Sequence, residues 1–298
     1  MHSILLIFLD GVGIGKKEPA NPFFKYGFKT FTKLFGKIPT LENQKINKDN
    51  RFLFPTDPIM GVPGLPLSGT GQTSIFCGVN SSRILGKHFG PYPHSMLIPI
   101  IREQNIFKLF KEKKKKVTFA NAYPKQFFDY IKSGDKRMTV TTLSCTLSQV
   151  PLKTATDLRN GNAVSAEIDN SIWVGKLGYK LPIIKPETAA KRLLKLVDEN
   201  NFTLFEYFLT DYLGHGRNKE TMEERLETLD KFLLYVFENI SDNHTVVLCS
   251  DHGNLEDTSI KMHTTNPSLT ITAGKYAEKL KNRITDISHI KDAILELY

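Results

Sequence analysis

Five short runs of aliphatic, β-branched and aromatic residues alternate with amphipathic helical stretches, and this alternation constrains the fold more than any other feature. The runs lie at residues 3–9, 117–123, 202–209, 244–250 and 268–273, and the helical stretches at 94–113, 186–199, 219–240 and 286–298. Strands separated by helices are typical of parallel pairing, because a helix usually makes the crossover that parallel strands require. The sequence therefore predicts an α/β fold with a mostly parallel central sheet and helices on both faces.

Residues 125–182 interrupt this alternation. They contain several turn residues, the run MTVTTLSC and the single tryptophan of the chain, Trp173. We expect this segment to form a small inserted cap on a core made of residues 1–124 and 183–298. A chain of 298 residues with 40% hydrophobic content is long enough for one large core plus such an addition.

Composition limits the compartment and the partners that we expect. No run approaches the roughly 20 apolar residues of a membrane span, and Asp10 interrupts the apolar start of the chain without a cleavage site. The three widely spaced cysteines favour reduced thiols and a cytoplasmic location. The net charge of +9 comes from scattered lysines and arginines, without the aromatic interleaving of single-strand binders. We therefore expect a small anionic substrate rather than nucleic acid or a membrane, and we leave the oligomeric state open.

The first strand runs directly into a glycine-rich loop, in the sequence ILLIFLDGVGIGKK. A phosphate-binding P-loop requires Ser or Thr after Gly-Lys, but Lys17 stands there. A dinucleotide loop requires a third glycine where this chain has Lys16. Two explanations remain: Asp10 caps an ordinary turn, or Asp10 is a functional carboxylate and the glycines make room around it.

The ends of the expected strands carry side chains that are typical of metal ligands. The set comprises Asp10 after the first strand, Asp211 and His215 in TDYLGHG, Asp251 and His252 in SDHGN, and His263 in KMHTTNP before the last strand. Each has an ordinary structural explanation by itself, but ligands in α/β sheets bind beyond the carboxyl ends of the strands. So many carboxylates brought together require cations. Mixed oxygen and nitrogen donors favour Zn or Mn, and paired metals are typical of phosphoryl transfer.

A candidate nucleophile lies in LPLSGTGQTSIFCG, residues 65–78. We expect Thr73 at the start of a short helix, where backbone N–H groups and the helix dipole favour an anion. A hydroxyl bound to a metal is more readily deprotonated and becomes a nucleophile. The alternative for Thr73 is an ordinary helix cap, and Ser68, Thr70 and Ser74 are the alternatives if the helix begins elsewhere.

The segments LIFLDGVGIG, GTGQTSIFCG, TDYLGHGRN, CSDHGNLED and MHTTNP resemble, in order and spacing, the metal motifs of the alkaline phosphatase superfamily. The most similar branch contains cofactor-independent phosphoglycerate mutase and phosphopentomutase. The resemblance implies an alkaline-phosphatase-like core and two divalent metal ions. It implies that one metal is held by Asp10, Thr73, Asp251 and His252, and the other by Asp211, His215 and His263. It also aligns Thr73 with the phosphorylated serine of the mutases.

Together these features predict a two-metal enzyme that hydrolyses a small phosphate mono- or diester through a phosphothreonine at Thr73. The mutases carry a much larger insert with an arginine-rich pocket, whereas the insert here spans only about sixty residues. A small cap favours hydrolysis, because a mutase must retain its dephosphorylated intermediate. Lys125, Arg137 and Arg159 in the insert are either substrate contacts or surface charges. The alternatives are a phosphomutase and a non-catalytic protein that keeps the metal ligands.

Overall fold

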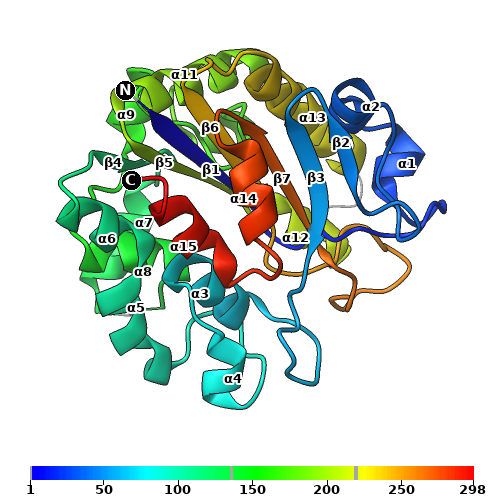
Figure 1. The fold of residues 1–298 in the computed structure, drawn as a ribbon. Coiled ribbons are helices and arrows are strands. Elements are labelled where there is room, and N and C mark those ends of the chain that lie inside the picture. Colours follow the sequence, from blue (N-terminus) through cyan, green and yellow to red (C-terminus); the bar gives the residue numbers. More distant parts are fainter. Residues whose placement is uncertain (1, 135–136, 218–220) are drawn as a thin grey trace.

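The computed structural model describes residues 2–134, 137–217 and 221–298, and a seven-stranded sheet forms its centre (Figure 1). The strand order is β2-β3-β7-β6-β1-β5-β4. The strands are β1 (Ser3–Leu9), β2 (Ile46–Lys48), β3 (Arg51–Thr56), β4 (Val117–Phe119), β5 (Phe202–Tyr207), β6 (His244–Cys249) and β7 (Ser268–Gly274). All five expected runs therefore contain a strand, and β2 and β3 are additional.

The sheet is mixed, which corrects the expectation of a mostly parallel one. β4, β5, β1 and β6 run parallel, whereas β7 is antiparallel to β6, β3 to β7 and β2 to β3. β2 and β3 form a hairpin whose two turn residues, Asp49 and Asn50, both have positive φ. Such a turn matches the right-handed twist of the flanking strands, and Asp and Asn tolerate it better than most residues.

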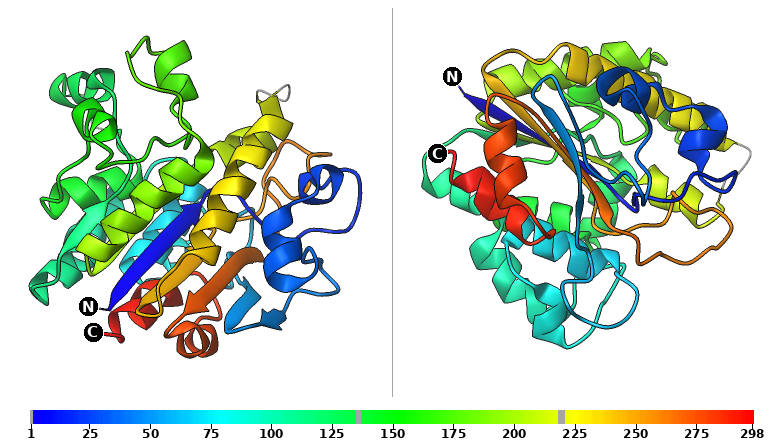
Figure 2. Two further views of the ribbon diagram at one scale, coloured as in Figure 1. Left: turned by 90° about the horizontal axis from the view of Figure 1, so that it is seen from above. Right: turned by 45° about the vertical axis from the view of Figure 1, so that its right-hand side comes forward.

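Side chains alternate between the two faces of the sheet, and helices cover both faces (Figure 2). On β1, Leu5, Ile7 and Leu9 face a cluster that includes α2 (Lys29–Phe35), α11 (Pro186–Glu199) and α13 (Met222–Glu238). The intervening β1 residues face a second cluster with α3 (Ser68–Cys77), α14 (Ala277–Arg283) and α15 (His289–Leu295). The remaining helices are α1 (Pro22–Tyr26), α4 (Ser81–Leu85), η1 (Ser95–Leu97), α5 (Ile98–Gln104), α6 (Ile106–Glu112), α7 (Lys125–Lys132), α8 (Val140–Leu147), α9 (Ala155–Arg159), α10 (Ser171–Gly175) and α12 (Leu209–Gly214).

The predicted helix over 94–113 is divided. It comprises η1, α5 and α6, and Asn105 separates the last two with an extended backbone. The Asn105 side chain accepts a hydrogen bond from the Lys108 N–H at 3.1 Å and so caps α6. Asn competes well for backbone donors, which favours a cap over a helix interior.

The segment predicted as a cap contains α7 to α10. Val140 and Cys145 of α8 are fully buried in the same cluster as Phe8 of β1. Trp173 of α10 instead belongs to a small separate cluster with Leu158. The segment thus contributes both to the main core and to a local one, and its division from the core at residues 125 and 182 stays a prediction.

The strand directions bring the predicted ligands to one edge of the sheet. β1, β5 and β6 end at this edge, and β3 ends there too. β7 is antiparallel to β6 and therefore begins there, which places the preceding residue His263 beside the loops that follow the parallel strands. The chain termini lie together elsewhere (Figure 1), where the Tyr298 hydroxyl donates to the His2 carbonyl. Among the described residues no helix combines the length and apolar character needed to cross a bilayer.

Candidate metal centre

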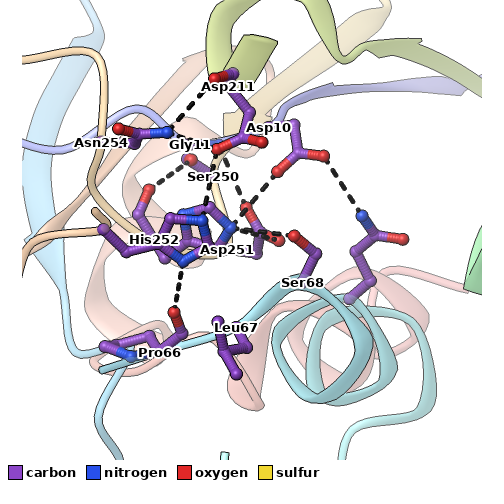
Figure 3. Close-up of polar contacts among 12 residues, drawn as sticks. Asp10, Gly11, Pro66, Leu67, Ser68, Asp211, Ser250, Asp251, His252 and Asn254 are labelled. Atoms are coloured by element: carbon purple, nitrogen blue, oxygen red, sulfur yellow. Dashed lines mark hydrogen bonds and ion pairs between the residues drawn. The ribbon is translucent and has the colours of Figure 1, made fainter. Parts of the chain in front are cut away.

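Asp10, Asp251 and His252 form the first group of possible ligands (Figure 3). His252 Nε2 lies 3.4 Å from Asp10 Oδ1 and 3.4 Å from Asp251 Oδ2. All three side chains are buried. The other oxygen of Asp251, Oδ1, accepts a hydrogen bond from the Gly11 N–H at 3.3 Å. The group offers two carboxylate oxygens and one imidazole nitrogen to a single point.

Asp211 and His263 form a second group with the same His252. His263 Nε2 lies 3.5 Å from Asp211 Oδ1, and His215 Nε2 lies 3.3 Å from Asp211 Oδ2. The rings of His252 and His263 stack with their centroids 3.8 Å apart, so the two groups are adjacent. The structure therefore brings together all six carboxylates and imidazoles predicted from the strand ends.

The electrostatics of the first group fit a divalent cation. Asp10 Oδ1 and Asp251 Oδ2 are buried without a hydrogen-bond partner. Burial, followed by the charge of Asp251, raises the pKa of Asp10 well above its ordinary value. Burial also raises the pKa of Asp251 to about 7 and, together with His263, lowers that of His252 to about 3. A cation at this point would offset the cost of the buried carboxylates and favour neutral imidazole.

Asp211 is instead held as a carboxylate by its neighbours. Burial acts to raise its pKa, but hydrogen bonds from His215, His263 and Asn254 outweigh burial and lower it. The Asn254 side-chain amide donates to Asp211 Oδ1 at 2.6 Å. His215 and His263 have raised pKa values through the same contacts. Metal ligation requires neutral imidazole, so a metal bound here would act against the raised pKa values of these two histidines.

Ser68, rather than Thr73, lies beside the metal ligands. The expectation that the helix begins at Thr73 is wrong, because α3 begins at Ser68. Ser68 Oγ lies 3.0 Å from His252 Nε2 (Figure 3). Thr73 is fully buried within α3, and its hydroxyl donates to the Gly69 carbonyl at 2.6 Å. The other two alternatives, Thr70 and Ser74, likewise donate to carbonyls, those of Leu67 and Thr70.

The glycines of the first loop make room for two carboxylates. Gly11 has φ +67°, and a Cβ there would lie 2.8 Å from Asp211 Oδ1. A Cβ at Gly13 would lie 2.5 Å from Glu256 Oε1. Both distances are too short for any other residue. The loop therefore packs closely against carboxylate groups at the metal centre.

The family to which this chain belongs follows from its sequence. A sequence model of the metalloenzyme superfamily matches residues 139–297, just over half of the chain. This chain belongs to the metalloenzyme superfamily. The predicted resemblance to the alkaline phosphatase group is thereby confirmed, and so is the expectation of a metal-dependent enzyme of this superfamily.

Individual relatives of this superfamily member are distant. A 2,3-bisphosphoglycerate-independent phosphoglycerate mutase of Metamycoplasma hominis is 29% identical over 133 residues, which cover 40% of this chain and 27% of the mutase. The chain thus matches only about a quarter of that relative's length. The alkaline phosphatase of the Antarctic bacterium TAB5 has a similar fold, with a TM-score of 0.58, 14% identity, and coverage of 99% of this chain and 97% of that one. The PH0037 protein of Pyrococcus horikoshii gives a TM-score of 0.54, 15% identity, and coverage of 93% and 86%. The likeness to the TAB5 structure supports an alkaline-phosphatase-like fold.

The three cations proposed for substrate binding do not gather at the centre. Lys125 and Arg159 are exposed on α7 and α9, and Arg137 is exposed before α8. Within the described part of the chain, no recorded contact joins them to a metal ligand. Their role in substrate binding stays a prediction.

Two buried glutamates near the centre were not predicted from the sequence, although each stands at an unusual position in it. Glu206 is the only charged residue in the apolar strand run FTLFEYFL, and Glu256 follows SDHGN by two residues. Glu206 lies on β5 opposite Phe8 of β1, and both glutamates are buried. A charged residue inside a buried strand is costly unless it has a function or a partner.

Glu206 gives the metal-free protein a pH-dependent stability. Burial raises its pKa from 4.5 to about 7, although the nearby Thr141 side chain opposes this shift. Its contribution to the free energy of unfolding is therefore complete below pH 4.5 and is lost as the pH rises through 7. We expect Glu206→Gln to unfold with a free energy up to about 3 kcal/mol above the wild-type value at pH 8, since one pKa unit corresponds to about 1.4 kcal/mol. Urea denaturation in EDTA at pH 4.5 and pH 8 measures this, and equal pH dependence in both proteins would contradict it.

Proposed function

We propose that this chain is a two-metal enzyme that hydrolyses a small phosphate ester, with Ser68 as the nucleophile. The observation that carries the proposal is the contact of Ser68 Oγ with His252 Nε2, at the point where both ligand groups meet. In this proposal one metal is held by Asp10, Ser68, Asp251 and His252, and the other by Asp211, His215 and His263. The donor set favours Mn or Zn, because both accept mixed carboxylate and imidazole ligands.

When bound, the divalent cations would lower the pKa of the Ser68 hydroxyl and stabilise charge on the phosphate oxygens. Ser68 begins the ten-residue helix α3, so the positive end of the helix dipole also favours an anion there. The ionised Ser68 oxygen attacks phosphorus, the bond to the ester oxygen breaks, and the alcohol leaves with a proton from solvent. Water then cleaves the phosphoserine, which releases phosphate and returns Ser68.

A phosphomutase is the second candidate, and the Metamycoplasma hominis mutase is the observation that favours it. A mutase must hold its dephosphorylated intermediate until phosphate returns to a different hydroxyl. The segment between residues 125 and 182 is short for that task, and its candidate cations are exposed. These features support hydrolysis. A non-catalytic metal-binding protein would have no use for a nucleophile at Ser68.

Metal content and turnover test the proposal together. After reconstitution with Mn or Zn, we expect elemental analysis to find about two metal ions per chain. We also expect the loaded protein to release free phosphate from p-nitrophenyl monoesters or p-nitrophenol from diesters. Regiospecific transfer on a phosphoglycerate without phosphate release would establish the mutase instead. Absence of bound metal would overturn both candidates.

A further inference from the structure

Glu256 lies behind the metal centre and is completely buried. Its Oε2 accepts hydrogen bonds from the backbone N–H groups of Gly13 and Asn254, both at 2.8 Å. Its Oε1 accepts from the Thr264 hydroxyl and from the Asn266 side-chain amide, the latter at 3.0 Å. A single carboxylate therefore joins three loop segments: the one after β1, the one that follows β6 and the one that precedes β7.

Each of these loops carries metal ligands. Gly13 follows Asp10 by three residues, and Asn254 follows Asp251 and His252. Asn254 also donates to Asp211 Oδ1, which extends the connection to the second ligand group.

The third loop is tied to the second by its backbone. Thr264, which follows His263, donates through its N–H to the Gly253 carbonyl at 3.0 Å. The loops that Glu256 joins thus hold ligands of both groups.

The surrounding backbone is shaped for this side chain. A Cβ at Gly13 would lie 2.5 Å from Oε1, and a Cβ at Gly15 would lie 2.8 Å from Glu256 Cγ. A Cβ at Gly253 would also collide with Oε1. Three glycines from two loops therefore leave the space that the carboxylate fills.

The chemistry of the partners favours a carboxylate over an amide. The backbone N–H groups and the Asn266 amide only donate here, and the Thr264 hydroxyl donates as well. A carboxylate has two oxygens with enough lone pairs for all four donors. In glutamine one of these oxygens becomes an NH₂ group that faces donors, and leaving buried donors unpaired is costly.

We propose that Glu256 is a positioning residue for both metals: it fixes the loops that carry Asp10, His252 and His263 and thereby sets the metal affinity. This inference rests on the proposed two-metal function. Glu256 contacts neither substrate nor metal in this proposal, because four donors already occupy its oxygens. It acts through the backbone on the side chains that bind.

The test compares Mn²⁺ affinity by isothermal titration calorimetry in wild type and Glu256→Gln. We expect affinity to fall by about 10- to 100-fold, the range seen when groups that orient metal ligands are lost. Asp230→Asn is the matched control, because Asp230 is a buried carboxylate that accepts from Lys29 N, Thr30 N and the Thr30 hydroxyl, away from the centre. We expect this control to lower the melting temperature and to leave Mn²⁺ affinity unchanged.

A milder pair covers the case in which Glu256→Gln does not fold. Thr264→Val removes one donor to Oε1, whereas Thr264→Ser retains the hydroxyl. We expect weaker Mn²⁺ binding in the first and near wild-type binding in the second. If Thr264→Val or a folded Glu256→Gln binds Mn²⁺ as tightly as the wild type, the positioning role of Glu256 is overturned. Turnover by the wild-type enzyme would still support the proposed function in that case. Metal binding without turnover in the wild type would overturn the function alone.

Discussion

We expect Ser68→Ala to lower turnover by at least about 1,000-fold, the scale seen when a catalytic nucleophile is removed, and Thr73→Val to leave turnover close to wild type. Ser68 Oγ is the hydroxyl beside His252. The Thr73 hydroxyl donates to the Gly69 carbonyl inside α3 and is fully buried. Valine matches the shape of threonine and removes only this hydroxyl. Steady-state kinetics on a p-nitrophenyl ester measure both variants.

Two controls separate loss of chemistry from loss of the site. The metal content of Ser68→Ala shows how much of the loss of turnover comes from weakened metal binding. Mass spectrometry of acid-quenched wild type locates the phosphoryl group, which we expect on the peptide that contains Ser68. The opposite pattern, with turnover abolished in Thr73→Val and retained in Ser68→Ala, would restore the nucleophile predicted from the sequence.

We expect Asp251→Asn to abolish metal binding at the first ligand group and yet to stabilise the metal-free protein. Burial, and then the charge of Asp211, raises the pKa of Asp251 to about 7. The folded state therefore loses stability as the pH rises from about 4 through 7, and asparagine removes that loss. Asparagine also keeps an oxygen for the Gly11 N–H. At pH 8 in EDTA we expect the free energy of unfolding to exceed the wild-type value by about 2–4 kcal/mol.

Urea denaturation at several pH values, with and without Mn²⁺, checks this expectation. The difference between the two proteins should shrink as the pH falls below 4, because Asp251 of the wild type then becomes protonated in the unfolded form as well as in the folded one. Added Mn²⁺ should stabilise the wild type by mass action, and it should stabilise the variant less, because only the ligand group of Asp211, His215 and His263 remains intact there. A variant less stable than wild type in EDTA at pH 8 would show that Asp251 supports the fold rather than the metal.

The sequence by itself determined where the strands of the parallel part lie and which side chains could bind metal. Runs such as residues 3–9 and 244–250 are mostly apolar because β1 and β6 are buried on both faces. Asp10 and Asp251 follow these runs directly, so their place at the sheet edge depends only on where the strands end. The same reasoning located Asp211 and His215 after β5.

Only the tertiary structure decided the strand directions and the roles of residues within the loops. β7 runs antiparallel to β6, and this direction, set by pairing between distant segments, brings His263 to the edge. α3 begins at Ser68 because the chain is extended at Leu67, with Gly69 close against the Tyr92 and Phe89 carbonyls. Glu256 has a role only because three loops converge on it. Local sequence does not predict such contacts, because their free energy depends on groups that meet only after folding.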